Sequence, residues 1–184
     1  MSKIVDPASD NSAAKSPFRT ILFTDLEGST ALLQEVGQSA YMSHLADHDV
    51  IIRRALIATL GREVKHTGDG IMASFDDVTG GLACALAIQE ALDARNAVGG
   101  KPDLRVRIGM ASGEPVDHND DIFGATVNLA SRICNIADAG HPLASEPLRD
   151  LGLEKGFSFR EGREVALKGF PEPACVFELA GRGS

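Results

Sequence analysis

The fold is indicated first by residues 62–75, which read REVKHTGDGIMASF. The runs Arg62–His66 and Ile71–Phe75 have the length and the β-branched or apolar residues that are typical of strands. A Gly-Asp-Gly run at residues 68–70 lies between them, and an Asp-Gly pair in this position is a strong signal for a tight turn. The stretch therefore predicts a β-hairpin that carries the carboxylate of Asp69 at its tip.

The segments on either side of this hairpin predict an order of strands and helices. We expect a strand over 19–24, helices over about 28–36, 39–60 and 78–94, a strand over 104–110, a helix over 125–137, and extended segments over 142–145, 157–167 and 174–179. Gly61 is a good C-terminal cap for the second helix. This ferredoxin-like order predicts an α+β fold, in which an antiparallel sheet has helices on one face and a free face for a site.

The length of 184 residues suits one domain that buries roughly two-thirds of its surface. We expect a flexible N-terminal tail over residues 1–16, because these residues are small and polar and Pro7 interrupts them. The folded domain is expected over residues 17–180, followed by a short C-terminal tail over 181–184.

Composition argues against several classes of function. The formal net charge is −8 and no run of Lys or Arg occurs, so the chain is a poor candidate for binding nucleic acid or an anionic membrane. Residues 1–15 lack the apolar run of a signal peptide, and no stretch approaches the length of a membrane span. Cys84, Cys134 and Cys175 form no Cys-x-x-Cys pair, which favours reduced thiols. We therefore expect a cytoplasmic protein without membrane insertion.

Two acidic residues follow predicted strands. Asp25 lies between a buried strand and a helix start, where the backbone N–H groups of residues 26–30 could hold a polyphosphate; Gly28, Ser29 and Thr30 are the candidates. Carboxylate oxygens suit Mg²⁺ or Mn²⁺. The alternatives are that Asp25 or Ser29 simply caps the helix and that Asp69 is an ordinary turn residue. If the first strand pairs with the hairpin, the two carboxylates lie near one point.

Other polar residues have spacings that suit a nucleotide. Lys65 could donate to a purine nitrogen from the sheet, or it could be a solvated strand lysine. Asn128 and Arg132 are four residues apart and share one helical face, which could hold a ribose and a phosphorus centre or be an exposed polar stripe. Asp121 precedes this helix. Lys168 could be only a loop charge.

Two further pairs favour structural roles. His44 and His48 have the i, i+4 spacing of zinc ligands, but the chain offers no evident third ligand, and a surface or half-buried stripe is the favoured interpretation. Arg105 and Arg107 share one face of a strand, and we interpret them as sheet-face residues rather than catalytic ones.

Taken together, these positions resemble the class III nucleotidyl cyclases, the catalytic domain of adenylyl and guanylyl cyclases. The resemblance covers about Pro17 to Leu179. It implies that Asp25 and Asp69, with Leu26 beside the first, hold two Mg²⁺ or Mn²⁺ ions per site. It also implies that Lys65 and Asp121 recognise adenine, Asn128 orients the ribose, Arg132 stabilises the transition state and Lys168 contacts the triphosphate.

The resemblance further implies a head-to-tail homodimer that acts on ATP. One chain would supply Asp25 and Asp69, and its partner the other polar residues. The ribose 3′-hydroxyl would attack the α-phosphorus and pyrophosphate would leave, with one metal activating the hydroxyl and the other neutralising the triphosphate. A regulatory domain, fused or separate, is a further expected partner.

Three alternatives to an adenylate cyclase stay open. A guanylate cyclase shares the metal and transition-state residues, but Asp121 would accept from the adenine amino group, which guanine lacks. A non-catalytic cyclase-like module, which only dimerises or senses, is expected to have lost a metal aspartate or the Asn–Arg pair, and neither is missing. Diguanylate cyclases and polymerase palms share the sheet architecture, but the chain has no Gly-Gly-Asp-Glu-Phe hairpin.

Overall fold

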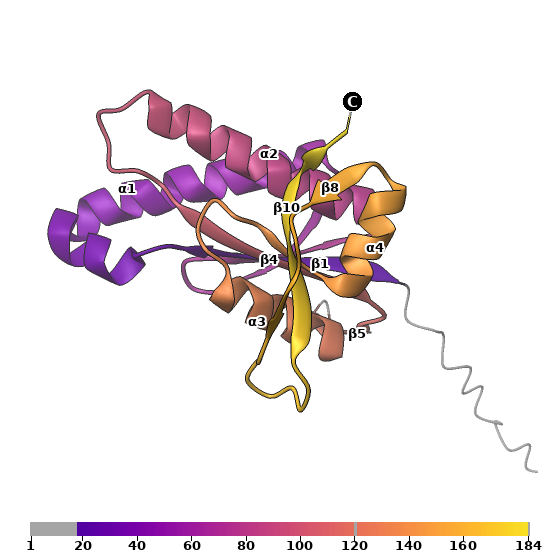
Figure 1. Cartoon of the computed structure of the whole chain (residues 1–184). Helices are drawn as coiled ribbons and strands as arrows, with labels where there is room; N and C mark the ends of the chain where they lie inside the picture. The colour runs from indigo at the N-terminus through magenta and orange to yellow at the C-terminus, as the bar shows by residue number, and fades with distance from the viewer. Residues whose placement is uncertain (1–17, 120, 184) are drawn as a thin grey trace, which may run out of the picture.

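The computed structural model describes residues 18–119 and 121–183, so the tail expected over residues 1–16 lies outside the described residues. A central sheet separates α1 and α2 on one side from α3 on the other (Figure 1). The elements are β1 (Arg19–Leu26), α1 (Ser29–Ala58), β2 (Arg62–His66), β3 (Ile71–Phe75), α2 (Val78–Ala97), β4 (Val106–Gly113), β5 (Val116–His118), β6 (Asp121–Phe123), α3 (Ala125–Ile136), β7 (Leu143–Ser145), α4 (Glu146–Glu154), β8 (Phe157–Phe159), β9 (Arg163–Val165) and β10 (Ala174–Arg182).

The sheet is mixed rather than fully antiparallel. Within the described residues it has eight strands in the order β2-β3-β1-β4-β7-β10-β8, with β9 paired to β10, and β5 and β6 form a separate hairpin. β1 is antiparallel to both β3 and β4, as expected. β4 and β7 are parallel, with Gly109 opposite Leu143, because the chain between them crosses over through α3. The α+β class is confirmed, and the all-antiparallel expectation is corrected.

Helices cover both faces of the sheet, which corrects the expectation of a free face. Leu22 packs in the core with residues of α1, α2 and α4, whereas its neighbours Ile21 and Phe23 pack on the opposite face with residues of α3. The approach of α3 is close, since a Cβ at Gly109 would lie 2.0 Å from the backbone nitrogen of Cys134. The nucleotide site that the sequence predicts is therefore expected at the ends and edges of the sheet rather than on an open face.

The sequence predicts two helices on either side of about residue 37, and the structure confirms this break. The helical region α1 is interrupted at Gly37, whose φ of 78° and ψ of 167° are not helical. At its C-terminal end the left-handed residue is Leu60, with φ 57°, rather than the expected Gly61. Gly61 donates its N–H to the Leu56 carbonyl over 2.8 Å, and a Cβ there would lie 2.4 Å from Phe75.

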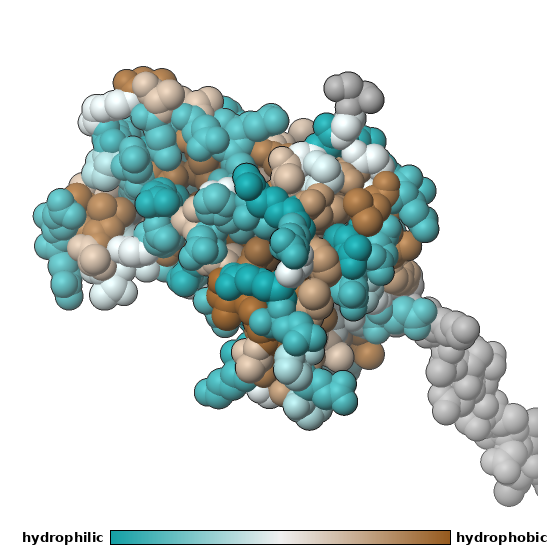
Figure 2. Space-filling view, viewed as in Figure 1, coloured by the Kyte–Doolittle hydropathy of each residue, from teal (hydrophilic) through white to brown (hydrophobic). Residues whose placement is uncertain are grey.

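The surface is mostly polar, with apolar side chains exposed over the first half of α1 and at the end of α2 (Figure 2). Among the described residues, no helix is both long enough and apolar enough to cross a membrane. Cys84 and Cys134 are buried and Cys175 is half-buried, all as free thiols. Burial raises the pKa of Cys84 to about 11 and that of Cys134 to about 12, which keeps both thiols protonated.

Candidate active site

The hairpin tip lies against the end of β1 and brings two carboxylates together. Phe23 is opposite Met72 in the β1–β3 register, and the Ile71 N–H donates to the Thr24 hydroxyl over 2.9 Å. A Cβ at Gly70 would lie 2.0 Å from the Thr24 carbonyl oxygen, so only glycine permits this approach. Thr24 and Gly70 are the chain neighbours of Asp25 and Asp69, which we call the acidic pair.

The charges at this point suit a divalent cation. Burial raises the pKa of the Asp25 carboxyl above its usual range, Asp69 raises it further, and Arg107 opposes both effects. Two adjacent carboxylates at a partly buried point repel each other, and a cation between them removes this cost. Because the Leu26 side chain is 2% exposed and apolar, only its main-chain oxygen could contribute. The residues present therefore fit Mg²⁺ or Mn²⁺, whose preferred ligands are oxygens.

Arg107 contacts the site, which the sequence interpretation missed. It is opposite Asp25 in the β1–β4 register, and its guanidinium donates to the Asp25 carboxylate. Its Nε is buried without a hydrogen-bond partner among the described residues. The interpretation of Arg107 as a sheet-face residue was therefore incomplete, because its guanidinium is also the cationic neighbour of the acidic pair.

Tyr41 is a second residue that the sequence interpretation missed. Burial raises the pKa of its hydroxyl, and the negative charge of Asp69 adds to the rise, whereas a hydrogen bond with Ser29 lowers it. Tyr41 is half-buried in the part of α1 that follows Gly37 and packs against the core, within electrostatic reach of Asp69. No local sequence pattern signals this neighbourhood, because Tyr41 and Asp69 are far apart in the chain.

The start of α1 offers backbone N–H groups beside the acidic pair. Gly28 is the N-cap, with a left-handed φ of 69°, and no side chain among the described residues caps the helix. The alternative that Asp25 or Ser29 serves as the cap is therefore wrong. The first turn has no acidic residue, so the N–H groups near Ser29 and Thr30 remain suited to an anion.

Lys65 and Asp121 form an ion pair, which we call the Lys–Asp pair. The Lys65 ammonium lies 2.8 and 2.6 Å from the two Asp121 carboxylate oxygens and 5.4 Å from the centre of the Phe123 ring. The hydrogen bond from Lys65 lowers the pKa of Asp121, and the Ile122 N–H lowers it further. Asp121 is therefore an ionised acceptor at neutral pH, held beside a fixed donor.

The remaining candidates form no hydrogen bond or ion pair with these pairs among the described residues. Asn128 is exposed and Arg132 half-buried on α3, and Lys168 is exposed in the turn between β9 and β10. Within residues 18–119 and 121–183, no side-chain hydrogen bond or ion pair involves any of the three. Within one chain, the predicted site residues thus form the acidic pair and the Lys–Asp pair, and Asn128, Arg132 and Lys168 are not hydrogen-bonded to either pair.

The two histidines of α1 are buried rather than arranged as a surface or half-buried stripe. His44 is 4% and His48 0% exposed. His48 lies 3.0 Å from the Asp49 carboxylate and His44 lies 3.4 Å from the Asp103 carbonyl oxygen, so the two rings have separate polar neighbours. Burial lowers the pKa of both rings, which keeps them neutral at pH 7. This arrangement is structural.

Comparison with known proteins shows the family of the chain. Residues 13–181 match the family described as the Adenylate and Guanylate cyclase catalytic domain, and the chain belongs to that family. An uncharacterized protein of Mycobacterium tuberculosis is 34% identical over 157 residues, which are 85% of this chain and 40% of that protein. The adenylate cyclase of Schizosaccharomyces pombe is 33% identical over 172 residues, covering 76% of this chain and 10% of that protein.

A solved structure shows the same fold. The guanylyl cyclase Cya2 has a TM-score of 0.81 and 24% identity to this chain, with 91% of this chain and 93% of that one covered. This likeness concerns the fold alone and does not distinguish adenine from guanine as the base. The chain spans less than half the length of both curated relatives.

Proposed function

We propose that the chain is the catalytic domain of an adenylate cyclase, which converts ATP to 3′,5′-cyclic AMP and pyrophosphate. The observation that carries this choice is the contact between Lys65 and Asp121 at 2.6 to 2.8 Å. In support, one relative that is 33% identical to this chain is named adenylate cyclase. We further propose that the domain acts in the cytoplasm under a regulatory domain, fused or separate.

The chemistry of the Lys–Asp pair favours adenine. Adenine has an amino donor at position 6, whereas guanine has an oxygen acceptor there. Ionised Asp121 can only accept and charged Lys65 can only donate, so the pair suits the adjacent amino group and ring nitrogen of adenine. Guanine would leave the carboxylate opposite an oxygen. A site that holds hydrogen-bonding groups rejects a ligand that leaves them unpaired.

The other candidates would bind and orient the rest of ATP. Bound Mg²⁺ or Mn²⁺, held by Asp25, Asp69 and the main-chain oxygen of Leu26, would supply Lewis-acid chemistry. Asn128 would hold the ribose so that its 3′-hydroxyl faces the α-phosphorus. Arg132 would donate to the charge that grows on the α-phosphoryl group, a role that typically contributes on the order of 100- to 1000-fold in rate.

The triphosphate would be held by backbone and side-chain donors. The N–H groups at Gly28, Ser29 and Thr30 lie at the start of α1, where the helix dipole favours an anion. Lys168 would contribute a mobile point charge from its exposed turn. These groups compensate locally for a chain whose formal net charge is −8.

We propose that the site is completed in a homodimer. Among the described residues, no hydrogen bond or ion pair joins the acidic pair to the Lys–Asp pair or to the polar residues of α3. A two-fold dimer can unite the acidic pair of one chain with Asn128 and Arg132 of its partner, and symmetry then creates two equivalent sites.

The test is a direct assay of the purified chain. It is incubated with ATP or GTP, each with Mg²⁺ or Mn²⁺ or with a chelator, and the products are separated by chromatography. We expect cyclic AMP and pyrophosphate from ATP, and no product in the presence of chelator. Faster formation of cyclic GMP than cyclic AMP, or no product with either nucleotide from a folded dimer, would refute the proposal.

A further inference from the structure

The edge strand β2 carries Lys65 in an irregular stretch of backbone. Among the described residues, β2 pairs only with β3, and the register of this pair shifts between Glu63 and Lys65, so Val64 is an extra, bulged residue. An edge strand has one side without backbone partners. Because β2 has only five residues, its own hydrogen bonds do little to fix which face of the sheet Lys65 occupies.

The bulge places Glu63 and Lys65 on opposite faces of the sheet. Glu63 is opposite Ala73, which packs in the core that includes residues of α1 and α2. Lys65 is opposite Met72, which packs on the face that α3 covers. In a regular strand, residues two apart share one face, so without the bulge Lys65 would point towards α1. The contact of Lys65 with Asp121 therefore depends on this bulge.

Side chains of α1 hold β2 on the face opposite Lys65. Arg53 donates from Nε and Nη2 to the two oxygens of the Glu63 carboxylate, over 2.7 and 3.0 Å. The Asp49 carboxylate accepts from Arg53 over 3.4 Å and lies 3.1 Å from Nε2 of His66. Glu63 and His66, on either side of the bulge, thus both have partners on α1. We call Asp49, Arg53, Glu63 and His66 the α1–β2 clamp.

The clamp differs from an ordinary surface ion pair. Isolated exposed pairs contribute little, but a two-point contact between a guanidinium and a carboxylate, or a network of charges, is stronger. Both conditions are met here, and the Asp49 and Glu63 side chains are only 19% and 29% exposed. The hydrogen bond from Arg53 holds the pKa of Glu63 below its usual range, so this carboxylate is ionised at neutral pH.

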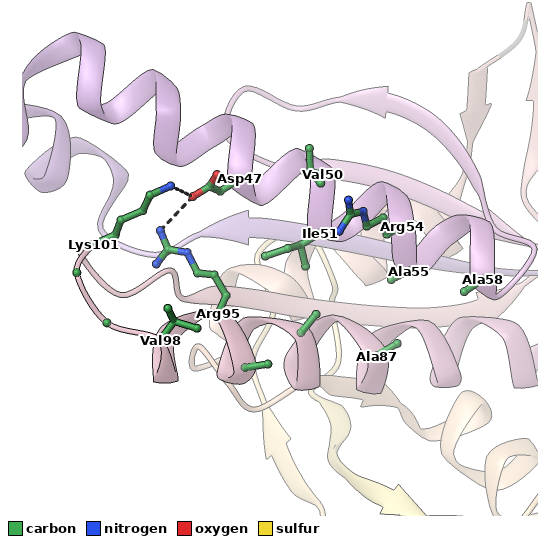
Figure 3. A pocket seen from close by; sticks show the side chains of 14 residues that line it. Asp47, Val50, Ile51, Arg54, Ala55, Ala58, Ala87, Arg95, Val98 and Lys101 are labelled. Atoms are coloured by element: carbon green, nitrogen blue, oxygen red, sulfur yellow. Dashed lines mark hydrogen bonds and ion pairs between the residues drawn. The ribbon is translucent and has the colours of Figure 1, made fainter.

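The helix that carries the clamp is itself anchored. Just before the clamp begins, Asp47 accepts from Lys101 over 2.8 Å and from Arg95 over 3.3 Å, which ties α1 to the end of α2 and the turn after it (Figure 3). On the inner side of α1, Ile52 and Leu56 are buried in the core. The clamp therefore extends from a fixed helix to a strand that has little support of its own.

We propose that the α1–β2 clamp holds the bulge of β2 in place, so that Lys65 faces Asp121 and can recognise the base. This inference rests on the proposed function, which assigns the base to Lys65. A slip of one residue in the pairing of β2 with β3 would turn Lys65 to the α1 face, away from Asp121. The clamp residues bond to one another and, among the described residues, none of them bonds to the Lys–Asp pair. They are therefore positioning residues, which act on the base through Lys65.

The test uses Arg53→Glu, which breaks the clamp, and the exchanged variant Arg53→Glu with Glu63→Arg, which restores a pair of opposite charges. Glu63→Gln, which removes a charge at similar size, is measured in parallel. Arg54→Glu is the matched control, because Arg54 is exposed on the wall of the pocket between α1 and α2 and has no ion pair within the described residues (Figure 3). The first readout needs no nucleotide. Lysines are acetylated with acetic anhydride, and mass spectrometry measures the rate at Lys65 relative to Lys155, which is exposed at the end of α4.

We expect Arg53→Glu to raise the relative acetylation rate at Lys65 about fivefold and Glu63→Gln to raise it about two- to threefold, because Lys65 is then released from Asp121. The exchanged variant should return the rate to within about twofold of the wild-type value, and Arg54→Glu should leave it unchanged. An unchanged rate in both clamp variants, a rise that the exchanged variant does not reverse, or an equal rise in Arg54→Glu would overturn the proposal.

The second readout is the binding of 3′-deoxyATP and 3′-deoxyGTP with Mn²⁺, measured by calorimetry, because neither nucleotide can be cyclised without a 3′-hydroxyl. The preference for adenine should fall about threefold in Arg53→Glu. A clamp that only stabilises the fold would weaken the binding of both nucleotides equally, and this result would overturn the proposal. A wild-type chain without a preference for adenine would instead refute the proposed function, and the acetylation rates would still decide whether the clamp holds Lys65.

Discussion

Changing Lys65 to Glu and Asp121 to Cys together should erode the preference for ATP over GTP. The Asp121 carboxylate lies 2.6 to 2.8 Å from Lys65, so both substitutions remove a charged hydrogen-bonding group. Hydrogen bonds to charged groups contribute about 1.5–3 kcal/mol, or about 10- to 150-fold in a ratio of rates. Because the side chains of Lys65 and Asp121 are 41% and 28% exposed, we expect the preference for ATP over GTP to fall by the lower end of this range, about tenfold.

The assay measures kcat/KM for ATP and for GTP in the wild-type chain and the double variant. The carboxylate that Lys65→Glu introduces would accept from the guanine ring N–H, and removal of the carboxylate at position 121 relieves its repulsion from the guanine oxygen. Asp117→Asn is the matched control, because Asp117 lies in the neighbouring strand β5 without contacting Lys65. If the double variant keeps the wild-type ratio within about twofold, while its dimer and fold are intact, the pair does not select the base.

Three more outcomes are expected. The variant Asp25→Ala should lower activity by about two orders of magnitude or more, and it should weaken Mn²⁺ binding measured by calorimetry. Unchanged Mn²⁺ binding would show that Asp25 is not a metal ligand. The variants Asp25→Ala and Arg132→Ala should each be inactive alone but should recover about one quarter of wild-type activity when they are refolded together. About half of the dimers are then mixed, and each mixed dimer has one intact site of two. Mixed dimers that are verified but inactive would contradict a shared site. Burial lowers the pKa of His44 and His48, so below about pH 6.5 the unfolded chain binds protons that the folded chain does not. The free energy of unfolding measured in urea should therefore fall as the pH drops below about 6.5. A constant free energy of unfolding from about pH 7.5 to 5.5 would argue against this effect.

Local patterns in the sequence predict most elements of the fold, because these elements depend on nearby residues. The hairpin is set by its Gly-Asp-Gly turn, and the break in α1 by Gly37. The expectation that all helices lie on one face of the sheet was wrong, since α3 covers the other face, although the sequence of the first strand contains a signal for this. Ile21, Leu22 and Phe23 are all apolar, and all three are buried. A continuous apolar run is typical of a strand that is covered on both faces, so it could have predicted a helix on each side.

The missed contacts at the candidate site depend on long-range register. Arg107 meets Asp25 only because β1 and β4 pair with these residues opposite each other. A shift of one residue would turn the arginine to the other face, and no local pattern specifies the register between strands so distant in the chain. Tyr41 likewise comes near Asp69 only through the tertiary fold, because the two residues are far apart in the chain.

The distribution of charge supports a shared site by an independent route. Within one chain, Asp121 neutralises Lys65 and Asp25 engages Arg107. Of the cations at the candidate site, Arg132 of α3 and Lys168 of the β9–β10 turn have no ion pair among the described residues. These two side chains therefore carry positive charge that is available for a triphosphate. In a chain of net charge −8, we therefore propose that a second copy supplies further cations for the triphosphate, so that each copy would complete the site of the other.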